Sequence, residues 1–422
     1  MNAFRRMLGV VCGAAMLFSG GIQPAVAAEK EAPQPIGVPD LPRRIKYQFP
    51  DSQRQQEIKL GIFRLHPSFQ TSVQYDDNVT LAPDNEQDDT LFTQIPALEA
   101  QVKMGDHSLE AAYGAEIINY VDQSDENAVN HMANGAFNMN FDNLSVVLSH
   151  AFEDTTNRTF SENSTRDHLK INSSEATARY DRPRWAAEGT YRHNDLNHET
   201  AALNNSDMQE DFFALLTGYK ILPKILALIE GDVGLINYDN NVSEADQSYY
   251  QLWTGLRGDL TSKLTTITKV GYHNRQMDDV PGLSQQEDYS GLVAHAELAW
   301  QPERDTGVRF IYDRAVKNST FATDNWYRQD KVSLSLRQRF WNKWIATPLI
   351  SWQSNVYPDL DTVGTDSKHR RDNFWQAEAS LRYEMQEWLS SGFTYAFRNR
   401  DSSFSTLDYD NNRFTFDVTA VF

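Results

Sequence analysis

The clearest pattern in the chain is an alternation of apolar and polar residues, and it is sharpest at the C-terminus. From residue 414 the even positions are apolar and most of the odd positions are polar. The apolar positions are Phe414, Phe416, Val418, Ala420 and Phe422. Successive side chains of a β-strand point to opposite faces of the sheet. The segment therefore predicts a strand with one face in lipid and the other in water.

Similar alternation recurs along the chain. It is found over residues 129–141, 185–193, 331–340 and 389–398, where aromatic and aliphatic residues occupy one parity and Asn, Thr, Ser, Glu or Arg the other. A period of two that recurs this often is typical of β-strands and does not fit helices.

The connections between these segments alternate between short and long. Short turns are predicted near residues 105–107, 142–143, 181–184, 222–224, 261–263, 302–306, 341–343 and 385–387. Long polar loops are predicted over residues 76–90, 122–128, 154–166, 194–208, 239–248, 276–287, 316–325, 356–371 and 399–411. This rhythm predicts a transmembrane antiparallel up-and-down β-barrel of about eighteen strands, or sixteen if one hairpin is misassigned, with both termini in the periplasm. A barrel of that size keeps an aqueous lumen unless a segment fills it.

The first 61 residues differ from the rest. Arg5 and Arg6 precede an apolar run over residues 7–18, and Ala25-Val26-Ala27 has the small-x-small pattern of a signal-peptidase site. We therefore expect a signal peptide over 1–27, a Pro-rich periplasmic extension over 28–61 and the barrel over 62–422. The extension could be a linker, a plug in the lumen or a docking segment. Cys12, the only cysteine, would leave with the signal peptide, so the mature chain could form no disulfide.

Composition narrows the function further. The net charge is −19, mean hydropathy is −0.58, and 12% of the residues are aromatic. No run of eighteen apolar residues follows the signal peptide, which excludes an inner-membrane helical protein. The negative charge argues against a nucleic-acid partner. A secreted, polar chain with aromatic stripes fits an outer-membrane barrel of a Gram-negative bacterium.

One hairpin resembles a known family. The run Gly61-Ile62-Phe63-Arg64-Leu65-His66-Pro67 and the later Tyr75-Asp76-Asp77-Asn78 are similar to the first-strand entry and the closing "Y-D-D-N" of the putative β-barrel porin type 2 family. The resemblance covers residues 61–422 in architecture, but its specific motifs lie in this hairpin alone. It implies export of an exopolysaccharide or capsular polysaccharide through the outer membrane. For Asp76, Asp77 and Asn78 themselves, a role in shaping the loop competes with ligand binding.

Charge patterning suggests candidate residues for transport. Several long loops are acidic, either as a solvated rim or as a surface that bridges to lipopolysaccharide through divalent ions; no metal site is predicted. If the aromatic parity faces lipid, a set of basic side chains would line the lumen: Arg257, Arg309, Lys331, Arg337, Arg339 and Arg382. They would attract an anionic sugar polymer, or they would form salt bridges that stiffen the wall.

Three functions stay open at this point. The first is a pore for polysaccharide export, the second a general or substrate-selective diffusion porin, and the third a closed structural or lipid-modifying barrel. The histidines, among them His131, His150, His193 and His273, fit no nucleophile-turn or zinc-binding motif, so no catalytic, cofactor-binding or metal-binding residue is predicted.

The expected partners follow from the barrel. They are outer-membrane lipid and lipopolysaccharide, the barrel assembly machinery, and, for an exporter, the polymer and periplasmic export components. The assembly signal is predicted in the C-terminal stripe, at Phe414, Phe416, Val418 and Phe422.

Overall fold

The structure is a computed structural model, and it describes residues 57–156, 166–200, 206–239, 245–279, 287–319, 326–363 and 366–422. The predicted signal peptide and nearly all of the predicted periplasmic extension lie outside these residues, so both stay predictions. No helix among the described residues is long and apolar enough to cross a membrane.

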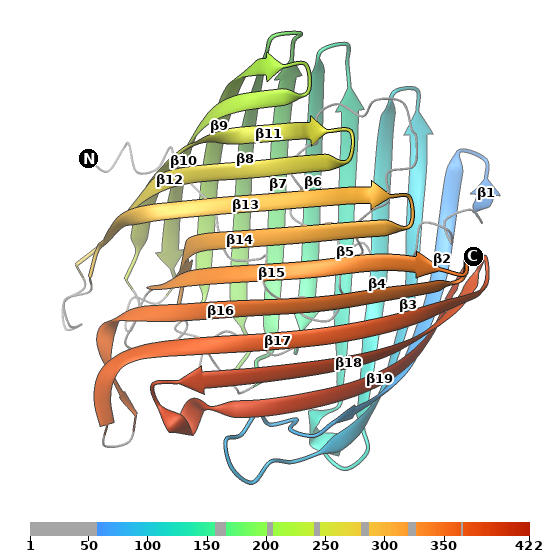
Figure 1. Cartoon of the computed structure of the whole chain (residues 1–422), viewed down its shortest axis with the longest axis vertical. Coiled ribbons are helices and arrows are strands. Elements are labelled where there is room, and N and C mark those ends of the chain that lie inside the picture. Colours follow the sequence, from blue (N-terminus) through green and yellow to red (C-terminus); the bar gives the residue numbers. More distant parts are fainter. Residues whose placement is uncertain are drawn as a thin grey trace.

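Eighteen antiparallel strands form a closed ring (Figure 1). They are β2 (Phe63–Asp76), β3 (Asp89–Met104), β4 (His107–Tyr120), β5 (Ala128–Asn140), β6 (Leu144–Thr155), β7 (Leu169–Asp181), β8 (Trp185–His198), β9 (Met208–Leu222), β10 (Ile225–Tyr238), β11 (Gln247–Thr261), β12 (Leu264–Met277), β13 (Tyr289–Glu303), β14 (Thr306–Asn318), β15 (Trp326–Phe340), β16 (Trp344–Val363), β17 (Asp366–Gln386), β18 (Leu389–Ser402) and β19 (Tyr409–Val421). Each strand pairs with its neighbours in the chain. The last strand pairs with the first, from Arg413 opposite Asp76 to Val421 opposite Ser68. The predicted barrel of eighteen strands is confirmed.

A short strand precedes the ring. β1 (Ile58–Leu60) folds back on the start of β2 through Gly61, whose φ of +64° suits glycine. In Figure 1, β13–β19 cross the front of the barrel at a steep angle to β2–β8 behind them, as expected for tilted strands that close into a cylinder.

The two faces of the wall differ as the alternation predicts. On β15, Leu334 and Leu336 are exposed, while the alternating Ser333 and Ser335 point to the other side. On β19, Phe414 and Phe416 are exposed and Asp417 is buried. Large apolar side chains that are exposed on one face of a closed barrel form the surface that meets lipid.

The short turns, the start of β2 and the end of β19 lie at one end of the barrel. Aromatic pairs gather there: Tyr180 with Trp185, Trp344 with Tyr383, and Trp388 with Phe422, with ring centroids 4.7–5.5 Å apart. Such a girdle marks a membrane interface. The orientation of this end toward the periplasm stays a prediction.

One predicted loop is wrong. Residues 356–371 belong mostly to a long hairpin of β16 and β17, with Leu360 opposite His369 and Asp361 opposite Lys368 after a register shift that follows Val356. β16 and β17 have 20 and 21 residues against 12–16 for the other strands of the ring, so the hairpin extends past its neighbours, and we expect water on both of its faces there. Its side chains can therefore be polar on both faces, and the alternation that identifies a strand in sequence is lost.

Candidate functional site

The candidate site is the inner face of the ring. Several ion pairs on the polar side of the wall join strands that are not neighbours. Lys269 on β12 binds Glu230 on β10 at 2.9 Å, and Arg339 on β15 binds Glu384 on β17 at 2.5 Å. Side chains of alternate strands converge only on the concave side of a cylinder. The polar parity therefore faces the lumen, and the apolar parity faces outward.

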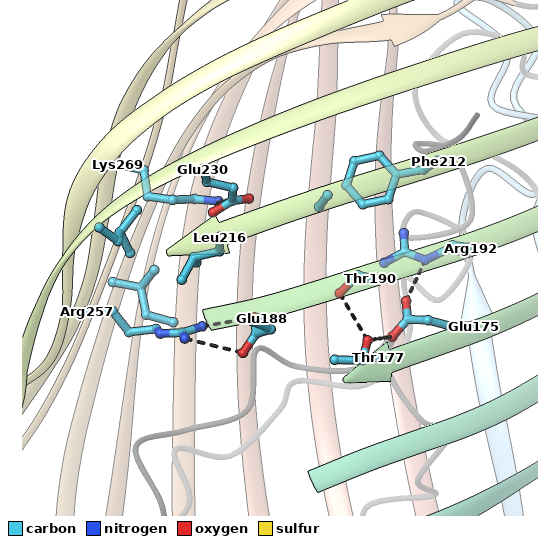
Figure 2. A pocket seen from close by; sticks show the side chains of 13 residues that line it. Glu175, Thr177, Glu188, Thr190, Arg192, Phe212, Leu216, Glu230, Arg257 and Lys269 are labelled. Carbon is cyan, nitrogen blue, oxygen red and sulfur yellow. Dashed lines mark hydrogen bonds and ion pairs between the residues drawn. The ribbon is translucent and has the colours of Figure 1, made fainter. Parts of the chain in front are cut away.

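A cavity of about 170 Å³ lies against the inner face of β7–β12 (Figure 2). Three acid–base pairs line it. Arg192 Nε donates to Glu175 Oε2 at 2.7 Å, Arg257 Nη2 donates to Glu188 Oε2 at 3.3 Å, and Lys269 Nζ reaches Glu230. Glu188 also receives Arg179 Nη1 at 3.5 Å, so one carboxylate lies between two guanidinium groups.

Apolar and aromatic groups complete the cavity. Phe212, Leu216, Leu228 and Ile267 lie among the charged pairs. The Arg192 guanidinium is 5.8 Å from the centre of the Phe212 ring, and Lys269 Nζ is 4.9 Å from the Trp253 ring. These cations are held by carboxylates on one side and by ring faces on the other. The cavity can therefore take a polar solute without presenting a large net charge.

The predicted basic lining lies on the inner face, but much of it is paired. Arg309 Nε donates to Glu297 at 2.8 Å, and Arg382 Nη1 lies 3.3 Å from Asp417. With the pairs of Arg257 and Arg339, four of the six proposed residues have carboxylate partners. Lys331 and Arg337 occupy the same face of β15. The contacts favour the salt-bridge alternative for the four paired residues.

Sequence reasoning missed a buried arginine cluster on β17 and β18. Arg370 Nη2 is 2.8 Å from Asp372 Oδ2, and Arg400 Nη2 is 2.9 Å from the same oxygen. All three side chains are almost fully buried. The Arg-x-Asp spacing at 370 and 372 places both groups on one face and was a usable signal. The contribution of Arg400 depends on strand pairing, which the spacing does not give.

The long-loop end of the lumen carries a second missed cluster. Arg275 on β12 donates to Gln247 Oε1 on β11 at 2.9 Å and to Asn318 Oδ1 on β14 at 2.8 Å. Asn318 Nδ2 in turn lies 3.6 Å from Met208 Sδ on β9, five strands away. Side chains therefore span part of the lumen at this end and narrow it.

The Asp-Asp-Asn motif at 76–78 joins the two ends of the ring. Asp76 Oδ1 accepts a hydrogen bond from Asn411 Nδ2 at 2.6 Å. Asp77 accepts from the backbone and side-chain nitrogens of Asn412 at 2.6 and 2.7 Å. Asn78 Nδ2 donates to Asp410 O at 2.9 Å. These three residues and residues 410–412 form a structure that we call the seam clasp, and their contacts favour the structural role over ligand binding.

The residues of the predicted assembly signal lie on the outer face. Phe414 and Phe416 are exposed there, and Val418 shares their parity. The Phe422 N–H donates to Pro67 O at 2.9 Å, so the last residue extends the seam between β19 and β2. Recognition of this stripe by an assembly machinery stays a prediction.

The histidines form pairs rather than a catalytic constellation. His150 Nδ1 lies 2.9 Å from Ser174 Oγ, and His193 Nδ1 lies 2.6 Å from Asp211 Oδ1. Both pairs are on the outer face; the register also sets Ser174 opposite His193, but the Ser174 hydroxyl is hydrogen-bonded to His150. Within the described residues, no group of three or more His, Cys, Asp or Glu side chains is placed to hold a metal ion.

Comparison with known proteins gives a family. The sequence profile described as putative beta-barrel porin 2 matches residues 54–422. Among solved structures, the chain is similar to OccAB3 of Acinetobacter baumannii, with a TM-score of 0.48 and 10% identity over 86% of this chain and 100% of that one. OpdK of Pseudomonas aeruginosa matches with a TM-score of 0.45 and 8% identity over 85% of this chain and 99% of that one. No curated protein matches the sequence.

Proposed function

The chain belongs to the putative beta-barrel porin 2 family and resides in the outer membrane of a Gram-negative bacterium, and from this premise we propose that it is a diffusion channel for small polar solutes. Transport through such a channel is passive and follows the concentration gradient. It needs no cofactor and no chemistry in the wall. The family membership also agrees with the resemblance seen in the first hairpin.

The observation that carries the proposal is the inner wall itself. Charged and amide side chains cover it, and the cations around the cavity on β7–β12 are balanced by carboxylates. A wall of this kind keeps the lumen hydrated while it offers alternating donors and acceptors to a passing solute. Side chains that converge near Arg275 and Asn318 narrow the long-loop end, which favours small solutes over a polymer.

Export of a polysaccharide is the other candidate from the sequence. Its physical basis was a basic lining that would concentrate a polyanion. Arg257, Arg309, Arg339 and Arg382 instead have carboxylate partners, which lowers the field that a polyanion would meet. The support that stays for this candidate is the resemblance of the first hairpin to the putative β-barrel porin type 2 family, which implies polysaccharide export.

Two measurements separate the candidates. Purified full-length protein in liposomes should admit arabinose faster than sucrose, and sucrose faster than raffinose, in a swelling assay. Deletion of the gene should slow uptake of small solutes and leave surface polysaccharide unchanged. Loss of surface polysaccharide from the deletion strain, with liposomes that stay impermeable to arabinose, would replace the channel by the exporter.

A further inference from the structure

Two facing parts of the inner wall carry opposite charge. β4–β6 and β13–β15 are nine strands apart in a ring of eighteen, which is the largest separation that the ring allows. On the inner face of β4–β6, the register places three carboxylates and no Lys or Arg: Glu110, Glu116 and Glu153. On the inner face of β13–β15 it places more cations than carboxylates. The cations are Arg309, Lys317, Lys331, Arg337 and Arg339. Arg309 is paired with Glu297 and Arg339 with Glu384 of β17, so with Asp313 five cations face three carboxylates and a positive excess of two stays.

The rest of the acidic side is neutral and rich in amides. The inner positions of β5 include Asn130, Asn134, Asn138 and Asn140. Glu116 Oε2 accepts a hydrogen bond from Asn130 Nδ2 at 2.8 Å. Amides orient a carboxylate without removing its charge, so this side of the lumen stays acidic.

Glu153 supplies an independent sign of a ligand position. Glu153 is only 8% exposed. It lies on the inner face, between Met132 on β5 and Ile171 on β7. Its Oε1 atom has no hydrogen-bond partner among the described residues. A buried carboxylate oxygen without a donor is costly, so such a carboxyl group either takes up a proton or receives a donor from the lumen. An ammonium group of a solute is such a donor.

We infer that the channel prefers small zwitterionic solutes, which carry an ammonium group toward the acidic side of β4–β6 and a carboxylate toward the basic side of β13–β15. This inference rests on the proposed function as a diffusion channel. Fixed charges of opposite sign on facing low-dielectric walls produce a field across the lumen. A dipolar solute that aligns with the field is stabilised, whereas a neutral solute gains nothing and an ion is attracted by one side and repelled by the other.

A matched pair of solutes tests the preference in proteoliposomes. Serine and glycerol are both small and hydroxylated, but only serine is zwitterionic. We expect Glu153→Gln to lower the serine-to-glycerol ratio of swelling rates about two- to fivefold, the factor for one solvated ion pair. Asp154→Asn removes a carboxylate from the adjacent residue on the outer face and should leave the ratio unchanged.

The basic side offers the converse test. Lys331→Gln should lower the same ratio, whereas Arg328→Gln, on the outer face of β15, should not. Both inner-face variants should lower serine entry, although they change the net charge of the lumen in opposite directions. A filter that responds only to net charge could not produce that pair of results.

The outcomes distinguish failure of the diffusion channel from failure of the zwitterion preference. Only protein that runs as heat-modifiable barrel is compared, so misfolded variants are excluded. If wild-type proteoliposomes admit glycerol no faster than protein-free liposomes, the diffusion channel itself fails. If glycerol enters and the ratio is the same in the wild type, Glu153→Gln and Lys331→Gln, the channel stands and the zwitterion preference is overturned.

Discussion

The outer faces of β5–β9 and of β14–β19 present different surfaces to the membrane. In the C-terminal sector most outer positions are aromatic or aliphatic, apart from an ion-paired group of Arg314, Arg328 and Asp330 on β14 and β15. They include Phe310, Leu334, Leu336, Ile350, Trp375, Leu381, Phe393, Phe414 and Phe416. In the N-terminal sector a row of directly opposed residues runs across the strands through His150, Ser174, His193 and Asp211.

The polar row is compatible with lipid because its members bind one another. His150 pairs with Ser174, and His193 pairs with Asp211. Tyr113 and His131 form a similar pair at 2.9 Å. A polar group in an apolar environment is tolerated when its hydrogen bonds are made. The comparison teaches that a barrel wall can meet the membrane in two ways, with apolar side chains or with polar side chains satisfied across the strands.

The largest expected effect comes from removing the end of the apolar sector. Deletion of Phe422 should leave unfolded protein in the periplasm and little barrel in the outer membrane. The residue extends the seam through Pro67, stacks on Trp388, and completes the predicted assembly signal. Heat-modifiability of membrane fractions on gels measures the assembled protein. Wild-type amounts of barrel from the deletion would show that the last residue is dispensable.

A charge placed on the outer face should separate the two sectors. Phe416→Arg, at the middle of β19, should lower the free energy of unfolding by about 2–4 kcal/mol, the cost of an arginine near the bilayer midplane. His193→Arg should cost less than about 1 kcal/mol, because the new cation retains Asp211 as its partner. Urea unfolding in lipid vesicles gives both values. Equal losses of unfolding free energy in the two variants would mean that Asp211 does not stabilise the new cation.

Removal of one member of a polar pair should cost more than removal of both. Ser174→Ala leaves the His150 ring without its partner in lipid and should destabilise the barrel by about 1–3 kcal/mol. Adding His150→Leu to that variant should recover most of the loss. The same unfolding assay completes the double-mutant cycle. If the losses of unfolding free energy add up in the double variant, His150 and Ser174 do not satisfy each other's hydrogen bonds.

The smallest perturbation tests the parity of the apolar sector directly. Cysteines at Ser335 or Arg337 should react with a small water-soluble maleimide, whereas cysteines at Leu334 or Leu336 should be shielded by lipid. The structure assigns these pairs to opposite faces of β15. Because a slip of one residue exchanges the faces, the reverse labelling pattern would refute the register of this strand.

The two sectors also explain what sequence could predict. In β19, lipid covers one face and water the other, so alternation identifies the strand and the side chains that share a face. Its boundaries are less exact, because the loop predicted over 399–411 includes the end of β18 and the start of β19. The turns after β3, β9 and β15 were predicted for the same reason. In the extension of β16 and β17, water meets both faces, and the pattern indicated a loop where the ladder continues.

The inner wall was predictable only in part. Parity placed Arg309 and Arg339 in the lumen, but their partners Glu297 and Glu384 follow from strand pairing and from the curvature of the ring. The contact between Asn318 and Met208 joins strands that are five apart and has no counterpart in local sequence. Such contacts depend on the shape of the closed barrel rather than on periodicity.

The seam clasp has a consequence for the order of events during biosynthesis. Its two halves, residues 76–78 and 410–412, are about 335 positions apart, so ribosomal synthesis delivers the first half long before the second. Every other strand pair in the ring joins consecutive strands, whereas this pair can form only after β19 has been made. A product that stops before residue 410 carries Asp76, Asp77 and Asn78 but lacks the residues that hydrogen-bond to them. The clasp thus makes closure of the cylinder depend on β19, and a chain without that strand stays open.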